Sequence, residues 1–134
     1  MIKIQKEDFN LEKEINIIKS KHNHIGAIST FIGCVRNIND EKKVVSINLE
    51  VYEDMATKSL SAICDYAQKN WKLIDTLLIH RHGNLKINEK IVLVATFSLH
   101  RIDSIDSCTY IMDYLKKEAP FWKKEFYEND SAWL

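Results

Sequence analysis

The sequence predicts an α+β fold with a mostly antiparallel sheet and flanking helices. The first observation is the order of its patterns, which runs helix, strand pair, helix, strand pair, helix and aromatic tail. The second is the scarcity of residues that break regular structure, with 3 glycines and 1 proline among 134 residues. So few breakers exclude low-complexity linkers and a sandwich of many tight turns. We see no internal repeat and no linker, and we expect one domain over residues 1–134.

Three segments are expected to be helices. Asn10 can cap the first, and the second covers roughly residues 55–71. The third begins near Asp103 or Ser104 and has to end before Pro120, because the residue that precedes a proline disfavours the helical region. The apolar stripes expected to face the core are Leu11, Ile15 and Ile18 in the first helix, Ala56, Leu60, Ile63, Ala67 and Trp71 with Cys64 beside them in the second, and Ile105, Cys108, Met112 and Leu115 in the third.

Four segments are expected to be strands, namely residues 26–36, 44–52, 75–83 and 91–99. They are rich in Ile, Val, Thr and Phe, and polar segments separate the two members of each pair. Alternation in the second strand predicts one apolar face, formed by Val45, Ile47, Leu49 and Val51. Residues 121–134 are aromatic and charged, and their pattern assigns no structure.

Composition limits the function classes. The 19 Lys and Arg residues balance the 19 Asp and Glu residues, which argues against a uniformly basic nucleic-acid-binding protein. Cys34, Cys64 and Cys108 are odd in number and widely spaced, so neither a disulfide framework nor a cysteine zinc site is expected. The sequence has no signal-peptide pattern and no apolar run near the roughly 20 residues that span a membrane. We therefore expect a cytoplasmic protein with no nucleic-acid or membrane partner.

The histidines are weak candidates for a metal site. His80 and His82 alternate along a predicted strand, and His100 follows the next strand, so three imidazoles could meet around zinc. No carboxylate lies at a recognisable ligand spacing, however, and the fixed positive charges of Arg81 and Arg101 adjoin two of these histidines. We predict no metal ligand, and we interpret His80 and His82 as hydrogen-bonded strand residues.

Basic residues gather where predicted elements end, which is where loops commonly build sites. Together they could bind an anion such as phosphate. The alternative is that a lysine in a last helical turn only complements the helix dipole. The residues concerned are Arg36, His100, Arg101, Lys116, Lys117, Lys123 and Lys124.

Five motifs follow one another along the chain. Four of them are GAISTFIGCVRN at 26–37, LEVY at 49–52 with Met55, IHRHGNL at 79–85 and SLHR at 98–101. The fifth and most specific is YLKKEAPFWKKE, which covers residues 114–125. Together and in this order, these motifs resemble the large catalytic subunit of molybdopterin synthase, the MoaE family. The match runs from about Gly26 to Trp133, and the first 25 residues match weakly.

This resemblance implies an α/β hammerhead-type fold and a dimer of large subunits. Each would bind one small ubiquitin-like sulfur-carrier subunit, which gives a heterotetramer. The carrier ends in Gly-Gly as a thiocarboxylate, and two sulfurs would pass from it to cyclic pyranopterin monophosphate. The product would be the dithiolene of molybdopterin, made during molybdenum cofactor biosynthesis. The implied activity is a sulfurtransferase that needs no cofactor and no reactive cysteine of its own.

By the same resemblance, Lys116 and Lys123 are the expected catalytic residues. They would stabilise developing negative charge and protonate leaving oxygen, and the division of these two roles is left open. Met112 either lines the tunnel or packs in the core. The expected substrate-binding residues are Cys34, Val35, Arg36, His100, Arg101, Lys116, Lys123, Lys124 and Glu125.

Three residues depart from the family pattern. His82 and Asn84 alter the segment that reads HRxGEL in the family, and Ile105 stands where an aromatic residue is common.

The rival interpretation of the chain is a non-enzymatic α+β module that binds an anion or small ligand for regulation.

Overall fold

The helices lie where the periodicity predicts them. The computed structural model describes residues 1–128 and 130–134, with α1 at Leu11–Lys19, α2 at Glu53–Asn70 and α3 at Arg101–Glu118. Asn10 caps α1 as expected, because its side-chain oxygen accepts a hydrogen bond of 2.9 Å from the backbone N–H of Lys13. Among the helices of the described residues, none combines the length and the apolar character that crossing a membrane requires.

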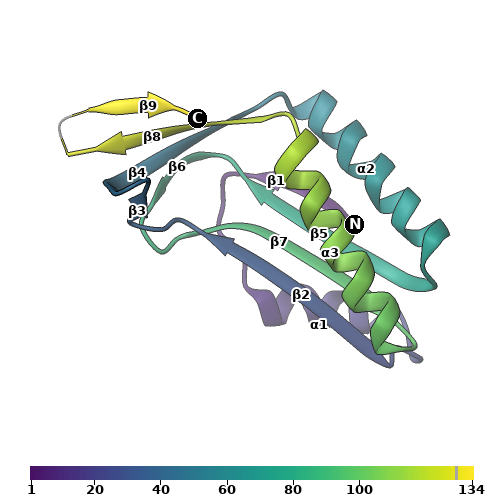
Figure 1. The fold of residues 1–134 in the computed structure, drawn as a ribbon. Helices are drawn as coiled ribbons and strands as arrows, with labels where there is room; N and C mark the ends of the chain where they lie inside the picture. The colour runs from purple at the N-terminus through teal and green to yellow at the C-terminus, as the bar shows by residue number, and fades with distance from the viewer. Residues whose placement is uncertain (129) are drawn as a thin grey trace.

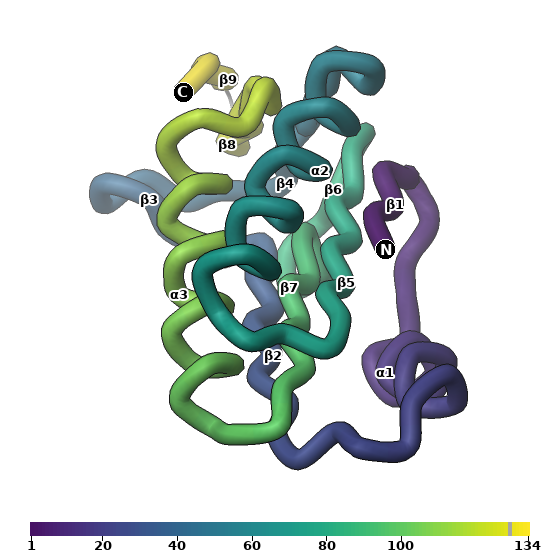
Figure 2. The backbone as a smooth tube through the Cα atoms, turned by 90° about the vertical axis from the view of Figure 1, so that its right-hand side faces the viewer, coloured from purple at the N-terminus to yellow at the C-terminus, as the bar shows by residue number. Residues whose placement is uncertain are grey.

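A four-stranded sheet lies between the helices, in the order β1-β5-β7-β2. Its strands are β1 at Ile2–Gln5, β5 at Leu73–Arg81, β7 at Lys90–Ser98 and β2 at Ala27–Cys34. The neighbours β5 and β7, and β7 and β2, pair antiparallel, whereas β1 runs parallel to β5. Helices α2 and α3 lie side by side on one face of this sheet, and α1 lies on the other (Figures 1 and 2).

The second sheet has five strands and extends beyond the first. Strand β4 lies at its centre and pairs antiparallel with both β6 and β8. The strands are β3 at Ile38–Asn39, β4 at Lys42–Val51, β6 at Gly83–Lys86, β8 at Phe121–Tyr127 and β9 at Ser131–Trp133. The unassigned tail is thus a hairpin of β8 and β9 that pairs with β4. The prediction of an α+β fold with mostly antiparallel sheets is confirmed.

Residues 76–81 of β5 and 93–98 of β7 are buried on both faces of the sheet. This burial explains why Leu77, Leu78 and Ile79 follow one another without a polar residue between them, as do Leu93, Val94 and Ala95. Leu78 and Val94 face α2 and α3, where they pack with Leu60, Ile63 and Ile111. The alternate residues of these strands face α1 and form a second cluster. Its members are Phe9, Ile18, Leu77, Ile79, Leu93, Ala95 and Phe97.

The expectation that Val45 faces the core is wrong. Val45 is 53% exposed, whereas Val44 is 4% exposed. The pairing of β4 with β8 shifts register between Val44 and Ser46, and an extra residue there reverses the alternation of side chains. Beyond the shift, Ile47 and Leu49 are buried as predicted.

The predicted apolar stripe of α3 is also partly wrong. The helix begins at Arg101, and Ile105 is half-exposed, while Ser104, Ser107, Cys108 and Ile111 form its buried face. Ser104 is satisfied in the interior because its hydroxyl accepts from Ser29 Oγ at 2.9 Å and its carbonyl accepts from Thr96 Oγ1 at 2.6 Å. Small serines let α3 approach the sheet closely, and a pattern of apolar residues does not reveal them.

Candidate functional site

Lys116 and Lys123, the two residues expected to be catalytic, line the same pocket. Its volume is about 540 Å³, and its wall combines strands β2, β5, β7 and β8 with the end of α3. Lys116 is exposed in the last turn of α3, whereas Lys123 is half-buried on β8. The lining residues are Phe31, Gly33, His80, Ile91, Val92, Met112, Asp113, Leu115, Lys116 and Lys123.

The chain reversal at Ala119 and Pro120 brings the two lysines together. Ala119 is extended at the end of α3, as the proline that follows it favours. Strand β8 then begins at once and pairs antiparallel with β4, with Lys123 opposite Leu49. Helix and strand thus approach the pocket from a shared corner, and each contributes one ammonium group.

Lys124 lies on the other side of β8 from Lys123. Adjacent residues of a strand point to opposite faces. The ammonium of Lys124 lies 5.4 Å from the ring centre of Phe126 and 5.3 Å from that of Trp133. The structure therefore separates this expected substrate-binding residue from the pocket that Lys123 lines.

Glu125 is placed to position β8. Its side chain shares the face of Lys123 but is buried, and it accepts hydrogen bonds from Asn39 Nδ2 at 2.9 Å and Tyr127 Oη at 2.8 Å. The bond to this carboxylate raises the pKa of the Tyr127 phenol. The ammonium of Lys123 lies 4.0 Å from Glu125 Oε2, at the limit of an ion pair. The side chain of Glu125 therefore ties β8 to β3, close to Lys123.

The expected residues at the end of β2 do not line the pocket themselves. Cys34 and Arg36 are exposed, and Val35 is buried in the core of the second sheet. The backbone of Val35 is fully paired, because its N–H donates to Glu89 at 2.9 Å and its carbonyl accepts from Asn88 at 2.8 Å. The residues of β2 that do reach the pocket are Phe31 and Gly33.

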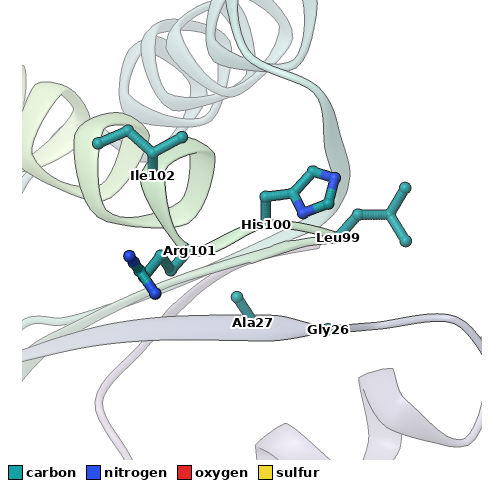
Figure 3. A pocket seen from close by; sticks show the side chains of 6 residues that line it. All are labelled: Gly26, Ala27, Leu99, His100, Arg101 and Ile102. Atoms are coloured by element: carbon teal, nitrogen blue, oxygen red, sulfur yellow. The ribbon is translucent and has the colours of Figure 1, made fainter.

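His100 and Arg101 lie in a second pocket at the opposite end of α3. This pocket has a volume of about 520 Å³ and is also lined by Gly26, Ala27, Leu99 and Ile102 (Figure 3). Lys116 lies fifteen positions after Arg101 in the helix, which corresponds to about 22 Å along the axis. Within one chain, the two ends of α3 cannot both contact one small substrate.

His80 lines the lysine pocket, and sequence reasoning about catalysis missed it. The Nδ1 atom donates to the carbonyl of Arg81 at 2.8 Å, and the ring stacks on Phe121 with 3.7 Å between centres. His80 is thus a hydrogen-bonded strand residue, as interpreted. Within the described residues, no group of three or more His, Cys, Asp and Glu side chains is placed to hold a metal. The strand pattern marked His80, but only the fold joins it to Lys116 and Lys123.

Burial of His80 predicts a loss of stability in acid. Burial lowers the pKa of this imidazole from 6.5 to about 4, so the unfolded chain binds its proton first as pH falls. The free energy of unfolding should therefore decrease from about pH 6.5 down to about pH 4, by about 3 kcal/mol in total. Urea unfolding across this range checks it, with His80→Phe as the reference that lacks the titrating group. Equal pH dependence in both proteins would contradict the prediction.

The chain is similar along nearly its whole length to proteins of one family. The family profile described as MoaE protein matches residues 4–118. The molybdopterin synthase catalytic subunit of Ralstonia nicotianae is 47% identical over 133 residues, 99% of this chain and 76% of that protein. Its counterpart in Vibrio cholerae is 43% identical over 133 residues, 99% of this chain and 88% of that protein.

Solved structures agree with the sequence relatives. The X-ray crystal structure of molybdopterin synthase from Staphylococcus aureus matches with a TM-score of 0.91 at 32% identity, over 98% of this chain and 95% of that chain. The overall fold of this chain is thus shared with that protein. Since the profile covers most of the chain and relatives above 30% identity cover nearly all of it, the chain belongs to the MoaE family.

Proposed function

We propose that this chain is the catalytic subunit of a molybdopterin synthase, a sulfurtransferase. It moves two sulfurs from the thiocarboxylated C-terminus of a small ubiquitin-like carrier subunit to cyclic pyranopterin monophosphate, and so makes the dithiolene of molybdopterin. The observation that carries the proposal is the pocket in which Lys116 and Lys123 meet from two different elements. The family relatives named as molybdopterin synthase catalytic subunits support it.

In this reaction the chain has to supply positive charge and to position the substrate beside the carrier terminus. The sulfur arrives on the carrier, and each transfer forms a carbon–sulfur bond on the substrate while an oxygen of the substrate leaves as water. A water molecule then hydrolyses the acyl carbon–sulfur bond to the carrier, whose terminus returns as a carboxylate. One ammonium, from Lys116 or Lys123, stabilises the negative charge that develops, and the other protonates the oxygen that leaves. The apolar side chains of Met112 and Leu115 line the same pocket and limit access of water. The lower local dielectric strengthens the attraction between the ammonium groups and the negative charge of the substrate.

We propose further that a second copy of the chain completes the site with His100 and Arg101. These residues lie too far from Lys116 to serve the same substrate molecule within one chain. The apolar side chains of Leu99, Ile102 and Ile105 are half-exposed or more beside them, as residues of a self-association surface would be. Arg36 is exposed at the end of β2 and is available to the same anionic substrate.

Mixing two inactive variants tests this two-copy site. Lys123→Ala and Arg101→Ala should each be inactive alone. Co-expression should restore about a quarter of wild-type turnover, because half of the dimers are mixed and each mixed dimer has one intact site. Full activity of Arg101→Ala alone, or no recovery in the mixture, would overturn the two-copy site.

A turnover assay tests the function itself. The wild-type chain is incubated with a thiocarboxylated carrier and cyclic pyranopterin monophosphate, and the dithiolene product is measured. Formation of product supports the sulfurtransferase. Saturable binding of the phosphate ligand without product would instead support a non-enzymatic anion-binding module.

A further inference from the structure

The inner wall of the lysine pocket differs chemically from its rim. Lys116 and Asp113 are exposed at the mouth, and Lys123 is half-buried. His80 lines the same pocket but is only 9% exposed, which places it at the inner end. The charged groups therefore meet solvent, whereas an imidazole faces the interior of the pocket.

The hydrogen bond to Arg81 fixes the tautomer of His80. A carbonyl oxygen only accepts, so Nδ1 carries the proton in this bond. Burial lowers the pKa of the ring to about 4, so the ring is neutral near pH 7 and Nε2 carries no proton. His80 therefore presents an acceptor, in contrast to the two ammonium groups of the pocket, which only donate.

The Nε2 atom opens into the pocket. Among the described residues, no group donates a hydrogen bond to it, yet no buried side-chain nitrogen or oxygen is left without a partner. Both observations hold only if Nε2 reaches open space, and the space beside His80 is the pocket. Stacking on Phe121 and the bond to Arg81 hold the ring in this orientation before any ligand arrives.

We propose that His80 Nε2 accepts a hydrogen bond from an uncharged donor, a hydroxyl or ring N–H, of the pterin substrate. This inference rests on the proposed function, and it makes His80 a specificity-determining residue for the same reaction. The apolar wall around it, which includes Val92, Met112 and Leu115, suits the uncharged part of such a substrate. The lysines nearer the rim suit its phosphate and the anionic tail of the carrier.

Two variants and one spectroscopic measurement test the proposal. His80→Phe keeps a flat ring that can stack on Phe121 but removes the acceptor, and His80→Gln offers an amide oxygen near the position of Nε2. The expected result is a fall in kcat/KM of roughly 10- to 100-fold in the Phe variant and a smaller fall in the Gln variant. In 15N-labelled wild-type protein, the Nε2 signal of His80 should shift on addition of the pterin substrate, while that of exposed His24 should stay.

The outcomes separate this inference from the proposed function. If the wild type and His80→Phe are equally active, the role of His80 is overturned and the function stays intact. The same holds if the Nε2 signal does not shift when the pterin substrate is added. A wild type that makes no dithiolene overturns both. Equal losses in the two variants point to a structural role and also overturn the inference. The signal from the wild-type protein decides the matter where a variant fails to fold.

Discussion

Alanine at Lys116 or at Lys123 is expected to lower turnover by about 10²- to 10³-fold. Both ammonium groups line the pocket, and each would act on charge that develops during sulfur transfer. The effect should fall mainly on kcat, because this stabilisation is greater in the transition state than in the bound substrate. Product formation under saturating carrier and pterin substrate measures it.

Lys117 offers a matched control for Lys116. It is also exposed in the last turn of α3 but does not line the pocket. Lys117→Ala should keep turnover within about twofold of the wild type, and the unfolding free energy of both variants should change by about 0.5 kcal/mol or less. An equal loss of turnover in Lys117→Ala would mean that the charge of the helix end, and not the pocket, explains the effect.

The double variant Lys116→Ala, Lys123→Ala tests whether the two lysines act together. Its fold-loss of turnover should be smaller than the product of the two single fold-losses, because the groups act as a unit.

Gly26→Ala is expected to destabilise the fold by about 3 kcal/mol. A Cβ at position 26 would lie 2.1 Å from the carbonyl oxygen of Leu99, which is backbone and cannot rotate away. The N–H of Gly26 also donates to Ser98 at 2.9 Å, so β2 cannot move without loss of this bond to β7. The midpoint of urea unfolding measures the cost, and loss of folding at room temperature would agree with the prediction.

Gly83→Ala separates this clash from the general cost of replacing glycine. Gly83 has a φ of +88°, and its added Cβ would meet only the flexible side chain of Lys6 at ordinary distances. The expected cost is the strain of a left-handed residue, about 1 kcal/mol. A cost at position 26 no larger than that at position 83 would contradict the steric argument.

Strand β8 is an element that the local alternation of apolar and polar residues does not predict. Lys123 and Glu125 lie on its inner face, where a half-buried strand normally carries apolar residues, so the alternation in the sequence is concealed. Pairing with β4 and the bonds from Asn39 and Tyr127 compensate Glu125 in the interior. Asn39 and β4 lie far along the chain from Glu125 and leave no local signal. Strand β1 was missed for the same reason, because it gains its partner from β5.

The sequence by itself determined the three helices, the strands β2, β4, β5 and β7, and the pair of lysines on either side of Pro120. Local periodicity and the restricted backbone before proline are properties of short segments, so they can be read without the fold. Tertiary structure decided which groups meet. It joined His80 to Lys116 and Lys123, and it placed Arg101 at the far end of α3. The physical reason is that pairing of distant strands and close packing of α3 on the sheet set these distances, and neither is encoded within one segment.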